Sequence, residues 1–431
     1  MANIIVAAPS IPGETAPLLV IARALVQRGH AVKMIAGTQF ADSVTATQAD
    51  FVPMYGSGDF TPALAAEYFR GRQGLTPGPE QLNYDWIHGF IDPIADQYAI
   101  LQELLSKQPA SILVANSLFL GALPVALGAP GHRPTRWIAV SANPLVISSD
   151  YTTPMGPIPG LTGAEARAAH RAANAGMTAS VEPARLRLEE HVRALGGTAP
   201  VDPFLQTTLE TPDVFASLSV PEFDFPRSDD PPNLRYIGIV TPESDPSWIP
   251  PAWWNELDDD KPVIVVTQGA TNNSDLRELV APALEAFADE DVHVVVALGR
   301  TVDDTGLDVP ANARLVEFAP FADLLPKADL LITSGGFGGT QIALAEGVPV
   351  IVAGVTEDKP FTAARAAFHG VGANLNTSTP TSVQIRETYQ DIIGSTTLQS
   401  ALDRLRDAYA SHNCIDELEE LMRVGPASPT V

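Results

Sequence analysis

Short runs of apolar residues alternate along the chain with longer stretches in which apolar residues recur at helical spacing. Runs of about four to eight apolar residues predict buried strands, and the stretches between them predict amphipathic helices. This alternation is typical of βα units, in which helices cover both faces of a parallel sheet. The pattern therefore predicts an α/β protein.

In the first half, strands are predicted at "NIIVAA", "AVKMIA", "SILVAN" and "RWIAVS", and a last one at "VFASLSV". A helix is predicted between the first two, because Pro17 suits a first helical turn and Gly29 suits the residue after a helix end. Two excursions interrupt the alternation: an aromatic, helical stretch between residues 60 and 108 and a helical stretch at about 163–195. Such excursions often form pockets.

A second series of βα units follows in the second half. Its predicted strands are "PVIVVTQG", "VHVVVALG", "ARLVEFAP", "DLLITSGG" and "VPVIVAG", and its predicted helices span about 274–288, 339–346 and 359–368. The stretch over residues 221–251 is too rich in proline and acidic residues to predict a regular element. We therefore expect a first domain over 1–222, a linker over 223–245, a second domain over 246–405, and a charged helix over 406–431 that packs back on the first domain.

Ligands of doubly wound sheets lie beyond the C-terminal ends of the strands. Two such domains facing each other would share one cleft, so we expect a single site built from both. At 431 residues the chain is also long enough for two cores of ordinary size.

Acidic residues outnumber basic residues by 51 to 26, which gives a formal net charge of -25. Nucleic acid and anionic lipid bind to basic patches, so we expect neither as a partner. An anionic small molecule would need a site made of backbone amides and helix ends. The charge thus directs attention to the glycine-rich part of the chain.

Three further features bear on location and redox chemistry. No apolar run reaches the roughly 18 to 20 residues of a membrane span. The N-terminal "MANIIVAAPS" has no basic leader, and its short apolar run is predicted to be a strand, so we expect a cytoplasmic protein. The single cysteine, Cys414, excludes an internal disulfide and a thiolate metal cluster.

The stretch "TSGGFGGTQ" joins a predicted strand to a predicted helix. Gly335, Gly336, Gly338 and Gly339 permit close approach of a ligand to the backbone, and with Thr340 they open a helix. The free amides and the positive end of the helix dipole at this point suit a diphosphate. A second phosphate-binding segment is predicted at Gly269, Ala270 and Thr271, after another strand.

The segment "FAPFADLLPKADLLITSGGFGGTQIALAEGVPVIVAGVTEDKPFTAARAAFHGVGANL" resembles the donor-binding signature of the UDP-glycosyltransferase superfamily of GT-B fold, particularly the bacterial natural-product glycosyltransferases. "PPNLRYIG" and "PGETAPLLVIARALVQRGHAVKMIAG" are also similar to that family, so the resemblance spans nearly the whole chain. It implies two facing Rossmann-like domains with a cleft between them. It also implies an enzyme that uses no metal or bound cofactor and takes a UDP- or dTDP-sugar as donor.

The resemblance implies roles for residues of the second domain. Phe318 and Phe321 stand where the family contacts the nucleobase, and Ser334 stands where many members have a histidine that contacts the diphosphate. Asp358, preceded by Glu357, matches a carboxylate that accepts hydrogen bonds from sugar hydroxyls, although it could instead cap the following helix. Lys359 replaces the usual glutamine, and we expect it to restore part of the positive charge lost at Ser334.

The family's catalytic base is a histidine oriented by an aspartate, and the matching positions here are Glu14 and Asn116. Asn116 can donate a hydrogen bond to Glu14 without adding a second negative charge, so Glu14 is the predicted base. Its place before a helix N-terminus predicts an ionised carboxylate of lowered basicity, which favours an acidic acceptor such as a phenol. Glu14 could instead only complement the helix dipole, in which case His88 and Asp92 are the substitutes to test.

The predicted acceptor pocket lies in the first domain, at Tyr84, Trp86, Phe90 and Phe119. The leading hypothesis is an inverting glycosyltransferase that moves a sugar to a hydroxyl, nitrogen or carbon nucleophile of a hydrophobic small-molecule natural product. A nucleotide-sugar epimerase and a catalytically silent nucleotide-sugar-binding helper are the alternatives. The epimerase would convert the donor without an acceptor, and the helper would bind nucleotide without releasing it from any donor.

Overall fold

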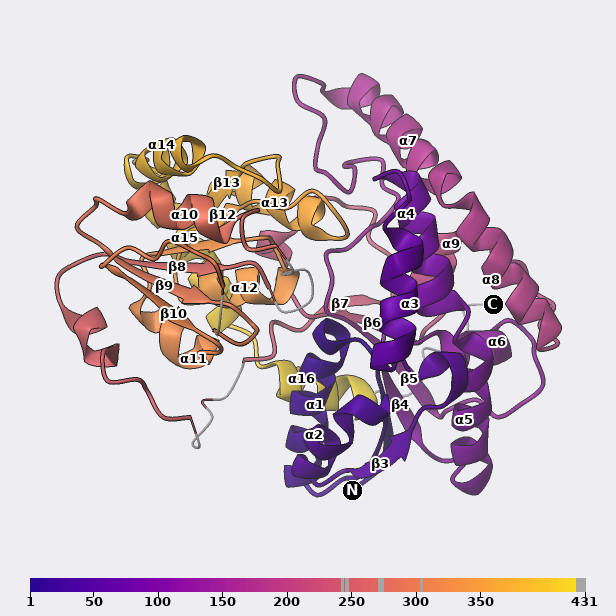
Figure 1. Cartoon of the computed structure of the whole chain (residues 1–431). Helices are drawn as coiled ribbons and strands as arrows, with labels where there is room; N and C mark the ends of the chain where they lie inside the picture. The colour runs from indigo at the N-terminus through magenta and orange to yellow at the C-terminus, as the bar shows by residue number, and fades with distance from the viewer. Residues whose placement is uncertain (242–243, 245–247, 270–274, 303–304, 424–431) are drawn as a thin grey trace. The chain divides into compact units, whose positions relative to one another are not determined.

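A computed structural model of the chain describes residues 1–241, 244, 248–269, 275–302 and 305–423. The chain divides into two compact units, each with one all-parallel sheet (Figure 1). The first unit comprises Met1–Leu218, Pro226–Val240 and Asn413–Val431, and the second comprises Ser219–Phe225 and Thr241–His412. Among the described residues, no helix has the length and apolar character needed to cross a membrane.

The sheet of the first unit has the order β3-β2-β1-β4-β5-β6-β7. Its strands are β1 (Asn3–Ala7), β2 (Ala31–Ala36), β3 (Asp50–Pro53), β4 (Ile112–Asn116), β5 (Arg136–Ser141), β6 (Val214–Ser217) and β7 (Leu234–Tyr236). In register, Val6 of β1 pairs with Met34 of β2 and Val114 of β4. The chain order reverses between β1 and β4, which makes the C-terminal ends of these strands the topological switch point.

Helices cover both faces of this sheet (Figure 1). The helices of the first unit are α1 (Pro12–Gln27), α2 (Ala41–Ala46), α3 (Pro62–Arg72), α4 (Pro79–Tyr84), the π-helix η3 (Asp85–Ile91), α5 (Ile94–Lys107), α6 (Leu123–Ala126), α7 (Gly163–Ser180), α8 (Glu182–Ala194), α9 (Phe204–Glu210) and α16 (Cys414–Arg423). Because side chains alternate along a strand, Ile4 and Val6 pack with α1 and α16, whereas Ile5 and Ala7 pack with α5 and α8. The C-terminal helix α16 thus contributes to the core of the first unit.

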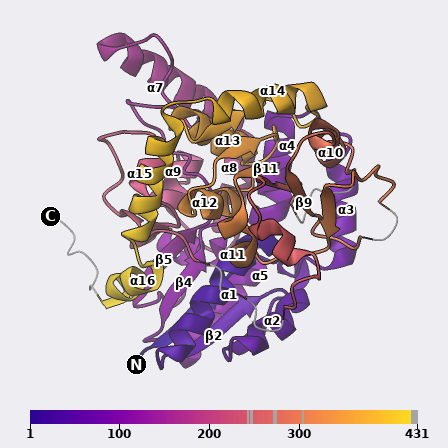
Figure 2. The same ribbon diagram turned by 90° about the vertical axis from the view of Figure 1, so that its left-hand side faces the viewer.

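The sheet of the second unit has the order β10-β9-β8-β11-β12-β13. Its strands are β8 (Val263–Thr267), β9 (His293–Ala297), β10 (Ala313–Val316), β11 (Leu330–Thr333), β12 (Val350–Val352) and β13 (Gly372–Asn374), and its helices are α10 (Val280–Phe287), α11 (Phe321–Leu324), α12 (Phe337–Ala345), α13 (Lys359–Phe368), α14 (Ser382–Ile393) and α15 (Leu398–Ala410). Helices α10 and α14 pack together on one face. Helices α12 and α15 lie side by side, as Figure 2 shows. The switch point lies between β8 and β11.

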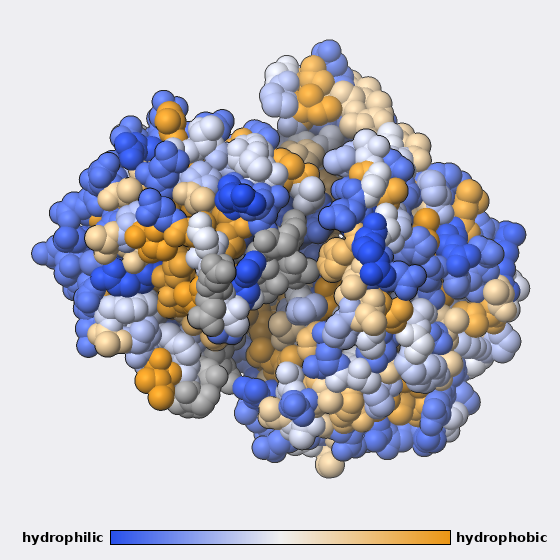
Figure 3. Space-filling model, in the orientation of Figure 1, coloured by the Kyte–Doolittle hydropathy of each residue, from blue (hydrophilic) through white to orange (hydrophobic). Residues whose placement is uncertain are grey.

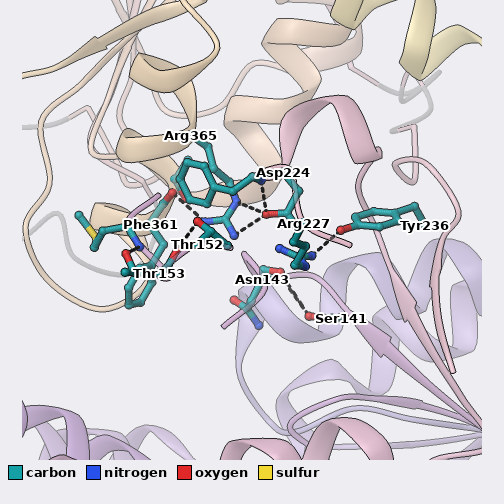
Figure 4. A network of polar contacts seen from close by, with 12 residues as sticks. Ser141, Asn143, Thr152, Thr153, Asp224, Arg227, Tyr236, Phe361 and Arg365 are labelled. Atoms are coloured by element: carbon teal, nitrogen blue, oxygen red, sulfur yellow. Dashed lines mark hydrogen bonds and ion pairs between the residues drawn. The ribbon is translucent and has the colours of Figure 1, made fainter. Parts of the chain in front are cut away.

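A buried ion pair fixes residues 219–225 within the second unit. Arg365 of α13 binds Asp224 with an Nη2–Oδ1 distance of 2.8 Å, and both residues are less than 5% exposed (Figure 4). The Arg365 guanidinium also lies 4.7 Å from the centre of the Phe225 ring, a cation–π geometry. The chain therefore enters the second unit after β6 and returns to the first unit to form β7.

Every strand predicted from an apolar run is present, and the helix predicted at 359–368 is α13. The prediction that 221–251 holds no regular element was wrong, because β7 lies inside it and pairs with β6. Consequently "VFASLSV" is not the last strand of the first sheet. Hydrophilic residues dominate the visible surface (Figure 3), in agreement with the large net charge.

Candidate active site

Glu14 lies in the first turn of α1, at the C-terminal edge of the first sheet. The turn that leads to it is held by Thr15, whose hydroxyl donates to the Pro9 carbonyl oxygen at 2.8 Å. Pro12 begins the helix with a fixed φ that suits the first helical position. The Glu14 side chain therefore emerges beside the switch point between β1 and β4.

Asn116, the last residue of β4, contacts this carboxylate. Its Nδ2 donates to Glu14 Oε2 at 2.7 Å, and its Oδ1 accepts the backbone N–H of Leu118 at 2.9 Å. Asn116 is 1% exposed. The structure thus brings together the two residues predicted for the base, which are 102 positions apart in the sequence.

A third residue, Asn143, was missed by the sequence analysis. Its Nδ2 donates to Glu14 Oε1 at 3.0 Å, so each carboxylate oxygen accepts one amide hydrogen bond. Asn143 follows β5, and its backbone N–H and C=O both bond the hydroxyl of Ser141 (Figure 4). Its position just beyond the strand that neighbours β4 is the sequence signal that could have identified it.

Burial raises the pKa of Glu14, and the hydrogen bonds from Asn143 and Asn116, which lower the pKa, do not offset this effect. The prediction of lowered basicity was therefore wrong in direction, because desolvation outweighs the groups that favour the ionised form. A carboxylate with a raised pKa is a stronger base than an ordinary one. This removes the reason for restricting the acceptor to acidic groups such as phenols.

His88 and Asp92 form a separate pair on η3 and the turn after it, with 2.8 Å between His88 Nδ1 and Asp92 Oδ2. Asp92 also binds Arg187 and His191 of α8. Burial acts to raise the pKa of Asp92, but the hydrogen bonds from Arg187 and His88 outweigh it and lower the pKa. Asp92 therefore ties η3 to α8, which is sufficient reason for its presence.

The predicted acceptor aromatics have different surroundings. The Tyr84 ring lies 4.4 Å from the His88 ring, and the Trp86 ring lies 5.5 Å from Phe90 and 4.8 Å from Phe204. Trp86 packs against the core cluster of the first unit. Phe119 is 1% exposed and belongs to that core, so packing accounts for its position, and its role in acceptor binding stays a prediction.

In the second unit, the glycine-rich turn opens α12. Gly335 has φ +102°, and a Cβ there would lie 2.5 Å from Val352 Cγ1, so this position requires glycine. Gly336 and Gly338 have open space where a Cβ would be. The first N–H groups of α12 have no intrahelical partner and are available to an anion.

Two further features mark the start of α12. Thr340 is fully buried, and its hydroxyl has no hydrogen-bond partner among the residues described. A Cβ on Gly339 would lie 3.1 Å from Cε2 of Phe321, so the Phe321 ring packs on this glycine. Phe318, by contrast, is 62% exposed and is free to stack on a base.

The end of β8 adjoins the end of β11 at this site. Ser334 donates through Oγ to the Gln268 carbonyl oxygen at 3.1 Å, and a Cβ on Gly269 would lie 3.6 Å from that hydroxyl. Gly269 has φ +83°, and its N–H donates to the Thr267 hydroxyl. The predicted residues Ala270 and Thr271 lie outside the described residues.

Glu357, Asp358 and Lys359 follow β12. Asp358 is the N-cap residue of α13, and its side chain makes no capping hydrogen bond, so the structure does not support the capping alternative. The sugar contact of Asp358 stays a prediction. Lys359 is 8% exposed, and its Nζ lies 2.6 Å from Glu357 Oε2. Its side chain passes over Gly354, where a Cβ would lie 2.0 Å from the backbone carbonyl oxygen of Ser334 and 2.8 Å from Lys359 Cδ. Lys359 and Ser334 are therefore neighbours.

Comparisons with known proteins bear on the family and the fold of the chain. Residues 281–423 match the family model described as the C-terminal domain of erythromycin biosynthesis protein CIII-like proteins. The chain is 33% identical to UDP-glycosyltransferase 2 of Phaeomoniella chlamydospora, over 97% of this chain and 95% of that protein. It is 34% identical to 4'-demethylrebeccamycin synthase of Lentzea aerocolonigenes, over 98% and 99%.

Among solved structures, the calicheamicin glycosyltransferase CalG4 superposes with a TM-score of 0.72, covering 99% of this chain and all of that one. The two sequences are 21% identical, so this likeness concerns the fold alone. It agrees with two Rossmann-like domains, each with helices on both faces of a parallel sheet. The predicted cleft between the domains stays a prediction.

Proposed function

The chain belongs to the UDP-glycosyltransferase superfamily and is a glycosyltransferase, and from this premise we propose that it transfers a sugar, with inversion at the anomeric carbon, from a UDP- or dTDP-sugar to a hydrophobic small-molecule natural product. The nucleophile is a hydroxyl group, or a nitrogen or carbon that carries a removable proton. The name of one relative, 4'-demethylrebeccamycin synthase, supports the acceptor class. The reaction as proposed needs no metal ion.

The second unit holds the donor in this proposal. The free amides at the start of α12 bind the diphosphate, and the open space at Gly336 and Gly338 lets it approach. Phe318 stacks on the nucleobase, and Asp358 accepts hydrogen bonds from sugar hydroxyls. When the bond between the anomeric carbon and the diphosphate oxygen breaks, the electron pair leaves with the diphosphate, and the same amides stabilise the added charge.

The first unit supplies the base. The single observation that carries this assignment is the Glu14 carboxylate, held through both oxygens by Asn116 and Asn143 at a topological switch point. Glu14 removes the proton of the nucleophile as it attacks the anomeric carbon. Its raised pKa increases the strength of the base, and its two amide donors keep the carboxylate in one orientation.

The test is a nucleotide-release assay with UDP- and dTDP-sugars against aromatic and polyketide acceptors. Glu14→Gln and Glu14→Ala should each lower kcat by about two to four orders of magnitude, the usual contribution of a general base. Both variants should still bind UDP or dTDP like the wild type, because the donor site is in the other unit. Near-normal turnover by Glu14→Gln would remove Glu14 from this role.

The same assay separates the alternatives. Nucleotide release that depends on the acceptor, with an inverted anomeric centre in the product by NMR, supports the proposal. Conversion of the donor in the absence of any acceptor indicates an epimerase. Nucleotide binding without release from any donor in the panel indicates a helper protein and contradicts the proposal.

A further inference from the structure

The two amides that hold Glu14 are not equivalent. Asn116 is hydrogen-bonded at both ends, because its Nδ2 donates to Glu14 and its Oδ1 accepts from the Leu118 N–H at 2.9 Å. Asn143 is bonded at one end: its Nδ2 donates to Glu14 Oε1 at 3.0 Å, and within the described part of the chain its Oδ1 has no hydrogen bond. Asn116 therefore has one orientation, and Asn143 can rotate without losing a second bond.

This difference matters because a base must exist in two protonation states. An ionised carboxylate only accepts hydrogen bonds, but a protonated one carries an O–H that donates. After proton transfer to Oε1, that O–H would meet the Nδ2 donor of Asn143, and two donors facing each other are unfavourable. A half-turn of the Asn143 amide about its last side-chain torsion brings Oδ1 to the O–H and restores a hydrogen bond.

We propose that Asn143 is a positioning residue whose amide turns over as Glu14 gains a proton, donating to the carboxylate through Nδ2 and accepting from the carboxylic acid through Oδ1, while Asn116 remains a fixed donor. The inference rests on the proposed function for the source of the proton, which is the nucleophile of the acceptor. The proton passes to Glu14 Oε1 during transfer and to solvent afterwards. Asn143 thus stabilises both states of the base.

The backbone of Asn143 is restrained, although its side-chain amide can rotate. Ser141, which is 4% exposed, bonds both the backbone N–H and the C=O of Asn143 (Figure 4). Pro144 follows, and a residue before proline is largely confined to extended conformations. The side chain is therefore held at a constant distance from Glu14 while its terminal group can rotate.

Among the described residues, no charged side chain is bonded to the Glu14 carboxylate. The elements around the Glu14 carboxylate are α1, β4 and the segment after β5, and the polar side chains that the last two direct at it are the neutral Asn116 and Asn143. In the part of the chain that is described, Glu14 forms no ion pair, and burial and these two amides account for the direction of its pKa. Substitutions at Asn116 and Asn143 should therefore report directly on Glu14.

The experiment measures the pKa of Glu14 in the full-length protein by carbon-13 NMR of labelled glutamate side chains, with Glu14→Gln to identify the signal. Asn116→Leu and Asn143→Leu are the matched pair, since leucine has nearly the shape of asparagine. Asn116→Leu removes a donor that helps only the anion and should raise the pKa. Asn143→Leu removes a partner of both states and should raise it by less than half as much.

Turnover is the second measurement. Asn143→Leu should lower kcat about tenfold or more with little change in KM, and Asn143→Ser, whose hydroxyl can donate or accept, should recover part of the loss. Since Asn116→Leu also removes the cap on the Leu118 N–H, Asn116→Ser serves as the reference if that variant does not fold. Circular dichroism checks the fold of every variant.

The outcomes decide between the explanations. If Asn143→Leu shifts the pKa of Glu14 as much as the substitution at Asn116 does, Asn143 is a fixed donor, and the proposed rotation of its amide is wrong. If neither the pKa nor kcat changes in Asn143→Leu, Asn143 has no positioning role. If the wild type releases no nucleotide but the two pKa shifts differ as expected, the proposed function fails and the behaviour of the two amides stands.

Discussion

The two candidate sites of this molecule are built in opposite ways. In the second unit, one continuous stretch from Thr333 to Lys359 supplies most of the site, and much of its contribution is bare backbone at glycines. In the first unit, the site consists of side chains that lie 102 and 129 positions apart in the sequence and meet only through the order of the strands.

This difference explains which site tolerates change. A backbone site depends on the absence of side chains, so a substitution at one of its glycines adds atoms. Where protein fills the space beside the glycine, the added atoms lower stability. Where the space is open, they obstruct the ligand. A side-chain site depends on partners, so a substitution removes a bond or leaves a donor without an acceptor. The backbone site should therefore be sensitive to added side chains, and the side-chain site to the removal of a hydrogen-bond partner.

The largest effect on folding is expected at Gly335. Gly335→Ala should destabilise the protein by about 2–4 kcal/mol, because it combines a left-handed φ of +102° with a Cβ 2.5 Å from Val352 Cγ1. Thermal unfolding, followed by calorimetry, measures the loss.

Gly338→Ala is the matched control, because its Cβ would enter open space and it lies within α12. It should leave stability unchanged or raise it by about 0.5–1 kcal/mol, yet weaken UDP or dTDP binding roughly 10- to 100-fold, since the methyl group would separate the ligand from an amide. Titration calorimetry measures the affinity. Unchanged binding by Gly338→Ala would mean that the nucleotide does not lie against this turn.

Phe318 and Phe321 separate an effect on nucleotide binding from an effect on stability. Phe318→Ala should weaken nucleotide binding by about 1–3 kcal/mol, the worth of a base stacked on an aromatic ring, with no loss of stability because Phe318 is 62% exposed. Phe321→Ala should instead destabilise the protein, since its ring packs on Gly339. If only Phe321→Ala weakens nucleotide binding, Phe321 and not Phe318 contacts the nucleobase.

Most of the fold could be predicted from the sequence, and the misses have a common cause. The strands β3, β7 and β13 were not predicted, and all three lie at sheet edges. Their sequences, DFVP, LRY and GAN, are short and lack an apolar run. An edge strand pairs on one side only and need not be buried, so the hydrophobic pattern that identifies central strands is weak there.

The candidate sites show the same limit. The donor segment was predictable because its residues are contiguous and glycine leaves a clear sequence signal. Asn143 was not predicted, because its proximity to Glu14 depends on β5 lying beside β4, which no local pattern reveals. The pKa of Glu14 was predicted in the wrong direction because burial, which decides it, is a property of the folded unit.

The pair of Lys359 and Glu357 sharpens the comparison, since it adds charged side chains to the site that is built mostly from backbone. Lys359→Gln should weaken UDP or dTDP binding by about tenfold, because the positive charge of a buried side chain that follows β12 is lost. Glu357→Gln should strengthen it by about two- to fivefold, because Glu357 competes for the Lys359 ammonium at 2.6 Å. If both substitutions weaken binding, Glu357 itself contacts the donor rather than competing with it.

The smallest effect is expected from Glu14 on stability. Because its pKa is raised in the folded protein, Glu14 contributes stability that is complete below its unfolded value of 4.5 and is lost as pH rises through the folded pKa. Glu14→Gln does not titrate, so its stability relative to the wild type should increase as pH rises through the folded pKa of Glu14. The amide N–H₂ of the glutamine would also face the N–H groups of Asn116 and Asn143, which lowers stability. This loss is independent of pH, so the test is the slope of the relative stability against pH.

The control is Glu103→Gln. The hydrogen bond from Lys107 lowers the pKa of Glu103, so its contribution is present above 4.5 and is lost as pH falls through the folded pKa. The relative stability of Glu103→Gln should therefore change with pH in the opposite direction. Chemical denaturation between pH 4 and 8 compares the two variants, and equal slopes would mean that Glu14 is not desolvated. Glu14 would then be in contact with solvent, and its pKa would be that of an ordinary carboxylate.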